Sequence, residues 1–431
     1  MLSSHDNGRW QGTFSGNRAV FFLGQLSASA ALAGLLLVSL PRRQARILAL
    51  GRIPERQALG GAELPAPGAR RMKCLALSLV LLALVNTARA DTVFKVGVAT
   101  RDFIPAEPYD WRGARTHALR AIIWYPAVAD AREEPQWAGP RFVPFFSAGS
   151  AARDAALAAG PPRPLIVLSH GNGDRASSLG WLGTALAAHG FVVVAVNHPG
   201  NNALEDYTVE GFSLRWLRAV DLGAVIDAML DDKTFGNQID PARIGAAGHS
   251  LGGYTVLAAV GGITDPVRLE AFCRSPDADV SCKPAPPFSE MRQNTLARLN
   301  SDADFRQRYG AAGKSYRDER IHAVFAMAPG PGPTFTPESL GKISIPVAIA
   351  AGSADEIVPT ASAAEALVKE IPHATLKLFQ HAGHFVFIGS CTLVGRLFFR
   401  GICRDPDGID REAVHAETIG LALDFFAANL R

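Results

Sequence analysis

The chain has 431 residues, of which 48% are hydrophobic and 19% charged, a composition typical of globular proteins and not of disordered or fibrous ones. The formal net charge is +3, but eleven of the 43 Lys and Arg and only three of the 40 Asp and Glu fall in residues 1–90. Residues 91–431 therefore carry −5, which argues against a nucleic-acid-binding surface, because such a surface needs clustered basic side chains.

Residues 70–90, RRMKCLALSLVLLALVNTARA, have the three parts of a secretory signal peptide: a basic start, an uncharged apolar run and the small-x-small cleavage site ARA. Met72 stands where such a peptide begins. We therefore expect residues 72–90 to be the signal peptide, residues 1–71 to be a non-native upstream extension, and the protein to be exported to the periplasm or the medium. The competing interpretation is a membrane anchor, since residues 19–40 are uncharged and long enough to span a bilayer.

From residue 91 onward, apolar β-branched runs alternate with helical patterns, which predicts one α/β domain over residues 91–431, with a mostly parallel sheet and helices on both faces. The first two expected strands are separated by a short polar loop and should pair as an antiparallel edge. The expected elements, in chain order, are strands at 94–98, 119–125 and 165–169, a helix at 178–189, a strand at 191–197, a helix at 213–231, a strand at 244–248, a helix at 251–260, strands at 323–328, 347–351 and 375–379, and a helix at 411–430.

Residues 263–320 interrupt this alternation. They are polar, contain several prolines and include one pair of cysteines. Because an insertion at this place follows a strand and helix of the sheet, we expect it to form a cap or lid over the sheet's upper edge.

The stretch AGHSLGG, residues 247–253, contains Gly-x-Ser-x-Gly between an expected strand and an expected helix. In that context the serine, Ser250, occupies a strained turn and its hydroxyl projects above the carboxyl end of the sheet. Gly248 and Gly252 are small because the strand and helix backbones nearly touch there. A serine hydroxyl is a poor nucleophile at neutral pH, so this interpretation requires an acid and then a histidine farther along the chain.

Asp355 follows the expected strand 347–351 in AGSADEIVP and is our candidate for the acid, with Glu356 as a weaker alternative. An ordinary turn or helix-cap role for Asp355 is the competing interpretation. The candidate base is His384 in HAGHFVF, because it follows a glycine in the loop past the last strand, and His381 is the alternative. A His-x-x-His metal pair is less favoured, since no third ligand stands nearby, so we expect neither metal nor cofactor.

The oxyanion of an acyl-transfer intermediate needs hydrogen-bond donors. The backbone N–H of Leu251, at the start of a helix, is one candidate. The backbone N–H of Asn172, in the loop HGNG after strand 165–169, is the other. We expect His170 to order this loop and His198 to belong to a turn with Pro199 and Gly200.

Cysteine usage agrees with export, because Cys74 falls in the signal peptide and the other four cysteines form two close pairs. The expected disulfides are Cys273 with Cys282 and Cys391 with Cys403. Four free thiols are the alternative, and zinc binding is disfavoured by the spacing. We expect the second disulfide to restrain the loop that carries His384.

The motifs SHGNG, GHSLGG, AGSADEIVP and HAGHF together resemble the α/β-hydrolase superfamily, and most closely the branch of bacterial predicted dienelactone hydrolases and secreted platelet-activating-factor acetylhydrolases (isoform II). KVGVATRDF, IIWYPA and HGFVVVAVNHPGN extend the resemblance over nearly all of residues 91–431. It implies an α/β-hydrolase fold and a serine esterase for short or oxidised acyl groups, with Ser250, Asp355 and His384 as the triad. Dienelactone hydrolases use a cysteine nucleophile, so the serine here puts a dienelactone substrate in doubt.

These observations predict an exported serine hydrolase that cleaves carboxylic esters, including lipid esters, through an acyl-enzyme. The alternatives are a lipase or polyester hydrolase, which would differ in pocket shape, and a non-catalytic binding protein on a hydrolase scaffold, which the intact set of catalytic residues disfavours. The expected partner is a small-molecule or lipid ester; no nucleic acid and no obligate protein partner is expected.

Overall fold

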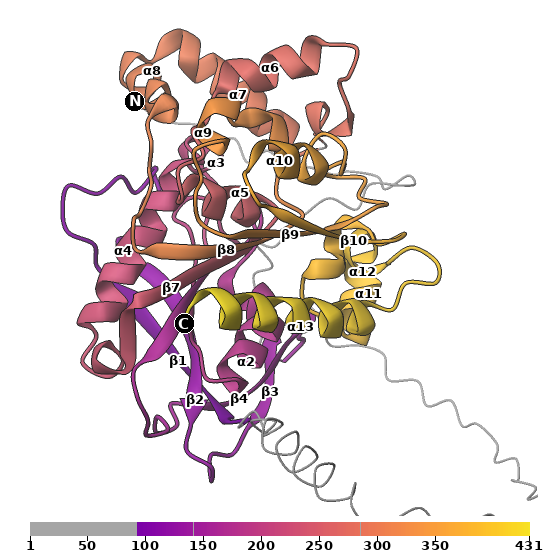
Figure 1. The fold of residues 1–431 in the computed structure, drawn as a ribbon. Coiled ribbons are helices and arrows are strands. Elements are labelled where there is room, and N and C mark those ends of the chain that lie inside the picture. The colour runs from indigo at the N-terminus through magenta and orange to yellow at the C-terminus, as the bar shows by residue number, and fades with distance from the viewer. Residues whose placement is uncertain (1–92, 141, 285) are drawn as a thin grey trace, which may run out of the picture. The chain divides into compact units, whose positions relative to one another are not determined.

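The structure, a computed structural model, describes residues 93–140, 142–284 and 286–431 (Figure 1). The expected upstream extension, signal peptide and alternative anchor all fall in residues 1–90 and lie outside the described part of the chain. Within that part, no helix has both the length and the apolar character needed to cross a membrane.

The domain is built on one ten-stranded sheet with the order β10-β9-β8-β7-β5-β6-β2-β1-β4-β3. From β5 to β10 the neighbouring strands are parallel, which confirms the predicted mostly parallel sheet. The strands are β1 (Lys95–Phe103), β2 (Leu119–Ala127), β3 (Glu134–Ala138), β4 (Phe146–Arg153), β5 (Arg163–Ser169), β6 (Val192–Val196), β7 (Ile239–His249), β8 (Ile321–Met327), β9 (Val347–Gly352) and β10 (Thr375–Phe379).

The first two strands pair antiparallel, as predicted, but they do not form the edge of the sheet. β4 pairs in parallel with β1 and carries β3 on its other side, so the edge lies two strands farther out. This prediction was wrong because β3 and β4, with the sequences EPQWA and FSAGSAAR, lack the apolar β-branched run by which a buried strand is recognised.

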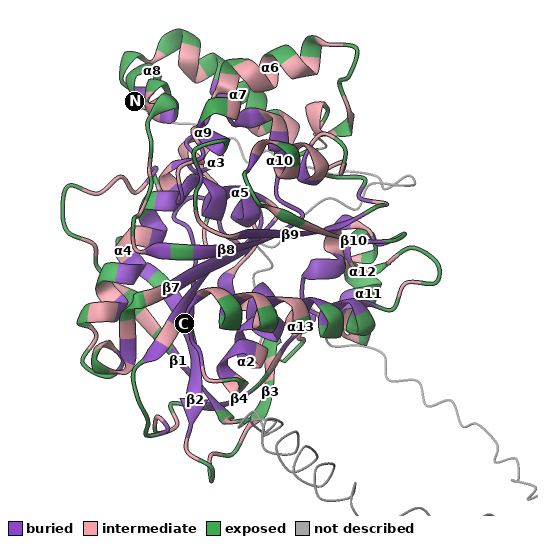
Figure 2. Ribbon diagram, viewed as in Figure 1, coloured by how far each residue is buried: buried purple, intermediate pink, exposed green. Residues whose placement is uncertain are grey.

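Helices cover both faces of the sheet (Figure 1). On β5, Leu165 and Val167 point into the core shared with α4 and α5, whereas Ile166 and Leu168 point into the core shared with α2 and α13. The strands at the centre of the sheet are buried, as Figure 2 shows. The helices are α2 (Gly180–Ala188), α3 (Val209–Ser213), α4 (Leu217–Asp231), α5 (Leu251–Ala258), α6 (Pro266–Arg274), α7 (Phe288–Ser301), α8 (Ala303–Tyr309), α9 (Pro337–Leu340), α10 (Ala364–Glu370), α11 (Leu393–Phe398), α12 (Arg400–Cys403) and α13 (Arg411–Asn429).

The helix expected at 213–231 is broken, since α3 ends at Ser213 and α4 begins at Leu217. Leu214 and Trp216 lie between the two helices and pack against Phe305 of α8. The break therefore turns two apolar side chains away from the sheet and toward the inserted segment.

The segment expected to be a cap forms α6, α7 and α8 between α5 and β8. Thr295 of α7 is hydrogen-bonded to Ser213 of α3, with 2.6 Å between the two hydroxyl oxygens. Asp302 is the N-cap of α8, and its carboxylate accepts a hydrogen bond from the Phe305 N–H. The insertion is thus an ordered helical unit fastened to α3 and to the link between α3 and α4.

Candidate active site

Ser250 lies in the turn between β7 and α5 with φ 57° and ψ −119°, a conformation that residues other than glycine rarely adopt. Its N–H donates to the Met327 carbonyl of β8, over 2.8 Å. The turn needs glycine on both sides: a Cβ on Gly252 would lie 1.8 Å from the Ser169 carbonyl oxygen, and a Cβ on Gly248 would lie 2.3 Å from the Gly252 carbonyl oxygen. The sharp turn expected from the sequence is therefore present.

Ser250, His384 and Asp355 are joined by hydrogen bonds. The Oγ of Ser250 lies 2.9 Å from Nε2 of His384, and Nδ1 of His384 lies 2.7 Å from Oδ2 of Asp355. The histidine and the aspartate are buried, while Ser250 lines a pocket. Because the carboxylate only accepts, Nδ1 of His384 carries the proton and Nε2 is left to accept from the serine hydroxyl.

Asp355 also has the turn role that was the competing interpretation. Its Oδ1 accepts from the N–H groups of Ile357 and Val358, over 2.9 and 2.7 Å, while Oδ2 holds His384. The turn thus aims the carboxylate at the histidine. Glu356, the alternative acid, lines the pocket without a hydrogen bond to His384. His381, the alternative base, is exposed.

His249, next to Ser250, holds the backbone of His384. Its Nε2 donates to the His384 carbonyl over 3.1 Å, and the two rings lie 4.8 Å apart. Burial and the neighbouring His384 lower the pKa of His249 well below its usual value, so this ring is neutral. The sequence shows a histidine here, but nothing in the Gly-x-Ser-x-Gly pattern indicates its partner.

The loop after β5 passes directly beside Ser250, because a Cβ on Gly171 would lie 3.5 Å from the Cβ of Ser250. Asn172 and Leu251 both line the pocket with Ser250. The Leu251 N–H is in the first turn of α5, where N–H groups have no acceptor within the helix. The side chain of Asn172 accepts from Nδ2 of Asn201, over 3.0 Å, and from the hydroxyl of Tyr207. The two predicted oxyanion donors thus belong to the pocket that contains the serine.

His170 and Arg218 support this loop from behind. Nδ1 of His170 donates to the Gly171 carbonyl over 2.7 Å, and Nε2 accepts from the His198 N–H over 3.3 Å. Burial and the charge of Arg218 lower the pKa of His170, which keeps the ring neutral. Arg218 donates to the His170 carbonyl, and burial lowers its own pKa to about 9, so it stays cationic at neutral pH. The arrangement matches the loop-ordering role expected for His170.

His198 is fully buried and belongs to a second Ser-His-Asp array. Its Nε2 lies 2.9 Å from Oγ of Ser169, and its Nδ1 lies 2.7 Å from Oδ2 of Asp221. The hydroxyl of Tyr109 and both Nη atoms of Arg112 also bond to Asp221. None of these residues lines the pocket beside Ser250. The turn expected here involves Pro199 and Gly200, whereas His198 itself is a core residue that braces the ends of β5 and β6.

The pocket above Ser250 has a volume of about 510 Å³, within the usual range for small-molecule sites. Residues of the inserted segment form much of its wall, as expected for a cap. The aromatic residues Trp216 and Phe385 also line it. Trp181 does not; its ring stacks on His415 with 3.9 Å between centroids. The other large apolar lining residues are Phe146, Phe212, Leu251, Leu269, Val280, Phe288, Leu296, Tyr309, Ile357, Val358, Ile388 and Ile402.

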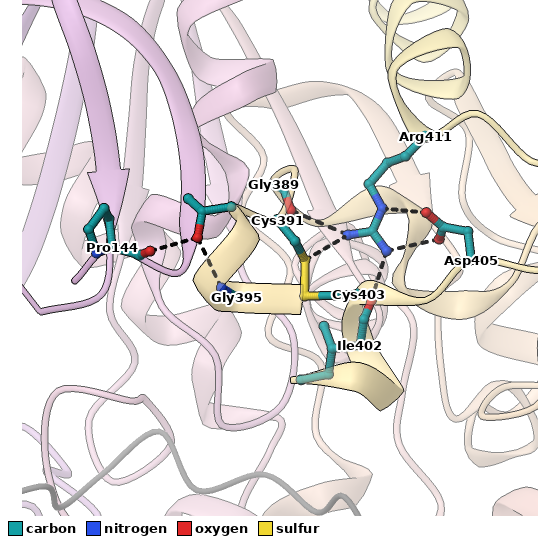
Figure 3. The surroundings of a disulfide bond; sticks show 9 residues. Pro144, Gly389, Cys391, Gly395, Ile402, Cys403, Asp405 and Arg411 are labelled. Carbon is teal, nitrogen blue, oxygen red and sulfur yellow. Dashed lines mark hydrogen bonds and ion pairs between the residues drawn. A yellow bond between two sulfur atoms is a disulfide. The ribbon is translucent and has the colours of Figure 1, made fainter. Parts of the chain in front are cut away.

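Both expected disulfides are present, Cys273–Cys282 in the inserted segment and Cys391–Cys403 after His384. Figure 3 shows the second one beside the guanidinium of Arg411. Arg411 donates to Asp405, over 2.9 and 2.8 Å, and to the Ile402 carbonyl, over 2.7 Å. The segment that follows His384 is thus held by the Cys391–Cys403 disulfide and by the Arg411–Asp405 ion pair, which has little exposure to solvent.

The sequence and the fold are similar to those of several known hydrolases. A family model described as serine aminopeptidase S33 (Hydrolase_4) matches residues 160–389. Lipase 1 of Moraxella sp. (strain TA144) is 40% identical over 77 residues, which cover 18% of this chain and 21% of that protein. Cutinase est1 of Thermobifida alba is 38% identical over 90 residues, 20% of this chain and 27% of the cutinase.

A platelet-activating factor acetylhydrolase of Cavia porcellus is 27% identical over 141 residues, 23% of this chain and 32% of that protein. The matches thus span less than a third of each of these relatives. Among solved structures, a ferulic acid esterase from Streptomyces cinnamoneus superposes with a TM-score of 0.52 at 19% identity, covering 78% of this chain and 91% of that one. This structural similarity shows that the two proteins share a fold.

Proposed function

The chain belongs to the serine aminopeptidase S33 (Hydrolase_4) family and has the α/β-hydrolase fold, and from this premise we propose that it hydrolyses carboxylic esters with Ser250 as the nucleophile. The observation that carries the proposal is the hydrogen-bonded chain from Ser250 through His384 to Asp355 at the base of an apolar pocket. The lipase, cutinase and acetylhydrolase relatives favour an ester over a peptide bond.

In the proposed mechanism, His384 Nε2 takes the proton of the Ser250 hydroxyl as the oxygen attacks the ester carbonyl. Asp355 holds the imidazole in the required tautomer and stabilises its positive charge. The N–H groups of Leu251 and Asn172 receive the developing oxyanion. His384 then gives the proton to the departing alcohol, and water repeats the sequence to release the acid from the acyl-enzyme.

The pocket supports a substrate with an apolar acyl group of limited size. Cap and loop residues surround Ser250 with aromatic and aliphatic side chains, among them Trp216, Phe288 and Phe385. We therefore favour short or oxidised acyl groups, including those of phospholipids, over the long chains of a lipase substrate or a polyester. The two disulfides are consistent with the export that we propose for the protein.

Turnover of p-nitrophenyl esters from acetate to palmitate tests the proposal, with alanine p-nitroanilide as the peptidase probe. We expect kcat/KM to be highest for the short esters and the anilide to be cleaved far more slowly. A diethyl phosphoryl inhibitor should add its mass to the peptide that contains Ser250. Cleavage of the anilide without ester turnover would replace the esterase with an aminopeptidase, and inactivation by a chelator would point to metal chemistry.

Removing the disulfide Cys391–Cys403 tests whether it restrains the loop of His384. The double variant Cys391→Ser/Cys403→Ser opens a loop with a sequence separation of 12 and should lose about 2–3 kcal/mol of unfolding free energy. Because this loop also lines the pocket through Gly401 and Ile402, kcat for p-nitrophenyl acetate should fall several-fold as well. Guanidinium unfolding and steady-state kinetics measure the two effects.

The matched control is Cys273→Ser/Cys282→Ser, which opens the other disulfide, in the inserted segment. Cys273 also lines the pocket, but neither cysteine belongs to the segment that follows His384, so this variant should lower stability with a smaller loss of kcat for a small ester. Unchanged stability and unchanged kcat in the first double variant would remove the proposed role of the loop disulfide.

A further inference from the structure

The outer face of α11 and the neighbouring turn between β3 and β4 expose large apolar side chains, which we call the apolar patch. Its members on α11 are Leu393, 85% exposed, and Leu397 and Phe398, each 63% exposed. Its members in the turn are Phe142, 88% exposed, and Val143, 43% exposed. Large clusters of exposed apolar side chains are rare on globular domains and usually mark a surface that binds a protein, a membrane or a ligand.

The two segments are far apart in sequence but in contact in the fold. The Thr392 N–H donates to the Phe145 carbonyl over 2.9 Å. The Thr392 hydroxyl donates to the Pro144 carbonyl over 2.7 Å, which is the dashed line that ends at Pro144 in Figure 3. The rings of Phe145 and Phe398 lie 6.2 Å apart. The exposed side chains of α11 and of the turn between β3 and β4 therefore belong to one continuous surface.

The inner face of α11 packs directly against the backbone of the turn between β3 and β4, and its apolar side chains point outward. A Cβ on Gly395 would lie 2.1 Å from the Phe145 carbonyl oxygen, so only glycine fits against the turn. Phe399, the next residue after α11, packs on Phe145 and Phe146. Leu393, Leu397 and Phe398 lie at the surface of the same helix.

The patch is mounted on a rigid support. The disulfide Cys391–Cys403 joins the residues before α11 to the end of α12. Arg411 of α13 holds the same segment through the Ile402 carbonyl and Asp405. Exposed apolar side chains on such a support keep their places, which is what a docking surface requires.

The same segment carries three exposed arginines. Arg396 is in α11, Arg400 begins α12 and Arg404 directly follows α12, at intervals of four residues. Within the described ranges none of them forms an ion pair, whereas the nearby Arg411 is paired with Asp405. Apolar side chains flanked by unpaired arginines are the combination that binds an anionic lipid surface.

The patch is also continuous with the pocket. Gly401 and Ile402 of α12 line the pocket that contains Ser250, and so does Phe146 of β4. Ile402 and Phe146 belong to one small apolar cluster that has Phe145 and Phe399 packed against it. A lipid ester leaving a surface beneath α11 would thus pass along apolar side chains on its way to the serine.

We propose that the apolar patch and its three arginines dock the protein on an anionic lipid surface, from which the pocket draws its substrate. The docking is inferred from the exposed residues alone. The second part of the proposal, that the pocket takes its substrate from the lipid surface, rests on the proposed esterase function. Leu393, Leu397 and Phe398 enter the interface between headgroups and acyl chains, while the arginines contact the anionic headgroups.

Sedimentation with vesicles of ether-linked phosphatidylcholine, with and without ether-linked phosphatidylglycerol, tests the docking without consuming the lipid. We expect binding to the anionic vesicles that weakens as salt is raised. Leu393→Ser/Leu397→Ser and Arg396→Glu/Arg400→Glu/Arg404→Glu should each weaken it by about 10- to 100-fold. The controls, Val220→Ser and Lys233→Glu, lie in or just after α4, on the far side of the domain from α11 (Figure 1), and should bind as the wild type does.

Hydrolysis of soluble p-nitrophenyl acetate separates the two proposals. We expect every one of these variants to keep the wild-type rate, because none of the altered residues lines the pocket. If no variant and no wild type cleaves the ester but the vesicle binding behaves as described, the docking stands and the esterase function fails. If vesicle binding is the same in the patch variants and the controls, the docking proposal is overturned.

A local probe shows whether α11 itself enters the lipid. In Phe398→Trp, the added tryptophan should shift to shorter wavelength on anionic vesicles and be quenched by brominated acyl chains, relative to the parent protein. A spectrum already blue-shifted without lipid would mean that another part of the chain covers the patch. Dimerisation that is lost in Leu393→Ser/Leu397→Ser would assign the patch to a second copy. Either result would overturn the proposal.

Discussion

Replacing Ser250 with alanine is expected to lower kcat for p-nitrophenyl acetate by about 10⁴- to 10⁶-fold, because the variant loses the nucleophile on which the acyl-enzyme depends. Residual turnover would come only from the oxyanion donors and from substrate binding. The fold should persist, since the Ser250 side chain has one hydrogen bond, to His384, and the backbone bonds of the turn remain. Steady-state kinetics and a thermal melt followed by circular dichroism measure both quantities.

Ser178 supplies a matched control for this substitution. It also lines the pocket, but its hydroxyl donates to the Arg175 carbonyl and has no histidine beside it. Ser178→Ala should therefore change kcat only a few-fold. If Ser250→Ala keeps more than about a tenth of the wild-type rate, far above the loss expected for a nucleophile, another group performs the attack.

The central sheet could be predicted because parallel strands buried on both faces appear as apolar β-branched runs. LIVLS in β5 and VVVAV in β6 are of this kind. β3 and β4 contain small and polar residues and are partly exposed, so nothing local distinguishes them from a loop. Their position at the edge of the sheet is set by contacts with the segment around Cys391, almost 250 residues later.

The candidate site was predictable for a related reason. Each of its residues follows a strand, and the parallel sheet brings the carboxyl ends of those strands to one edge. Ser250, Asp355 and His384 could thus be placed together from local motifs and chain order. The choice of His384 over His381 rests on its position after a glycine in the loop past the last strand, and the structure brings His384 to the serine and leaves His381 exposed.

The buried array behind the site could not be predicted, because its partners are distant in sequence. Arg112 and Asp221 are separated by 109 residues, and Tyr109 and Asp221 by 112. The sequence around His198 indicates a turn, which is correct for Pro199 and Gly200 but misses the histidine's place in the core. An arginine in a loop and an aspartate on a helix ordinarily lie at the surface, and only the fold shows that these two are buried together.

Replacing Asp221 with alanine is expected to lower the free energy of unfolding by about 3–5 kcal/mol, because it leaves the buried guanidinium of Arg112 without its counter-charge. The two Nη atoms of Arg112 lie 3.1 and 2.7 Å from the carboxylate oxygens, and neither side chain has appreciable exposure. Burial alone lowers the pKa of Arg112, but the Asp221 carboxylate outweighs it and raises the pKa above its usual value. Guanidinium unfolding measures the loss.

Asp227 is the matched control, since it lies on the same helix and pairs with Arg320 at the surface. Asp227→Ala should cost less than about 1 kcal/mol, as exposed ion pairs do. A loss for Asp221→Ala no larger than that for Asp227→Ala would mean that water or another group compensates Arg112.

The double variant Arg112→Met/Asp221→Leu distinguishes two contributions to the free energy of unfolding. One is the net contribution of the ion pair, and the other is the destabilisation caused by one buried charge left without its partner. Removing both charges avoids an unpaired buried ion, so much of the stability lost in Asp221→Ala should return. We expect lower activity than the wild type in Asp221→Ala and in the double variant alike, because Asp221 also holds Nδ1 of His198, whose Nε2 bonds to Ser169 at the end of β5. Ser169 leads into the loop that carries Asn172. A double variant that is stable but slow with p-nitrophenyl acetate would show that the buried array positions the oxyanion loop, whereas full activity would limit its role to stability.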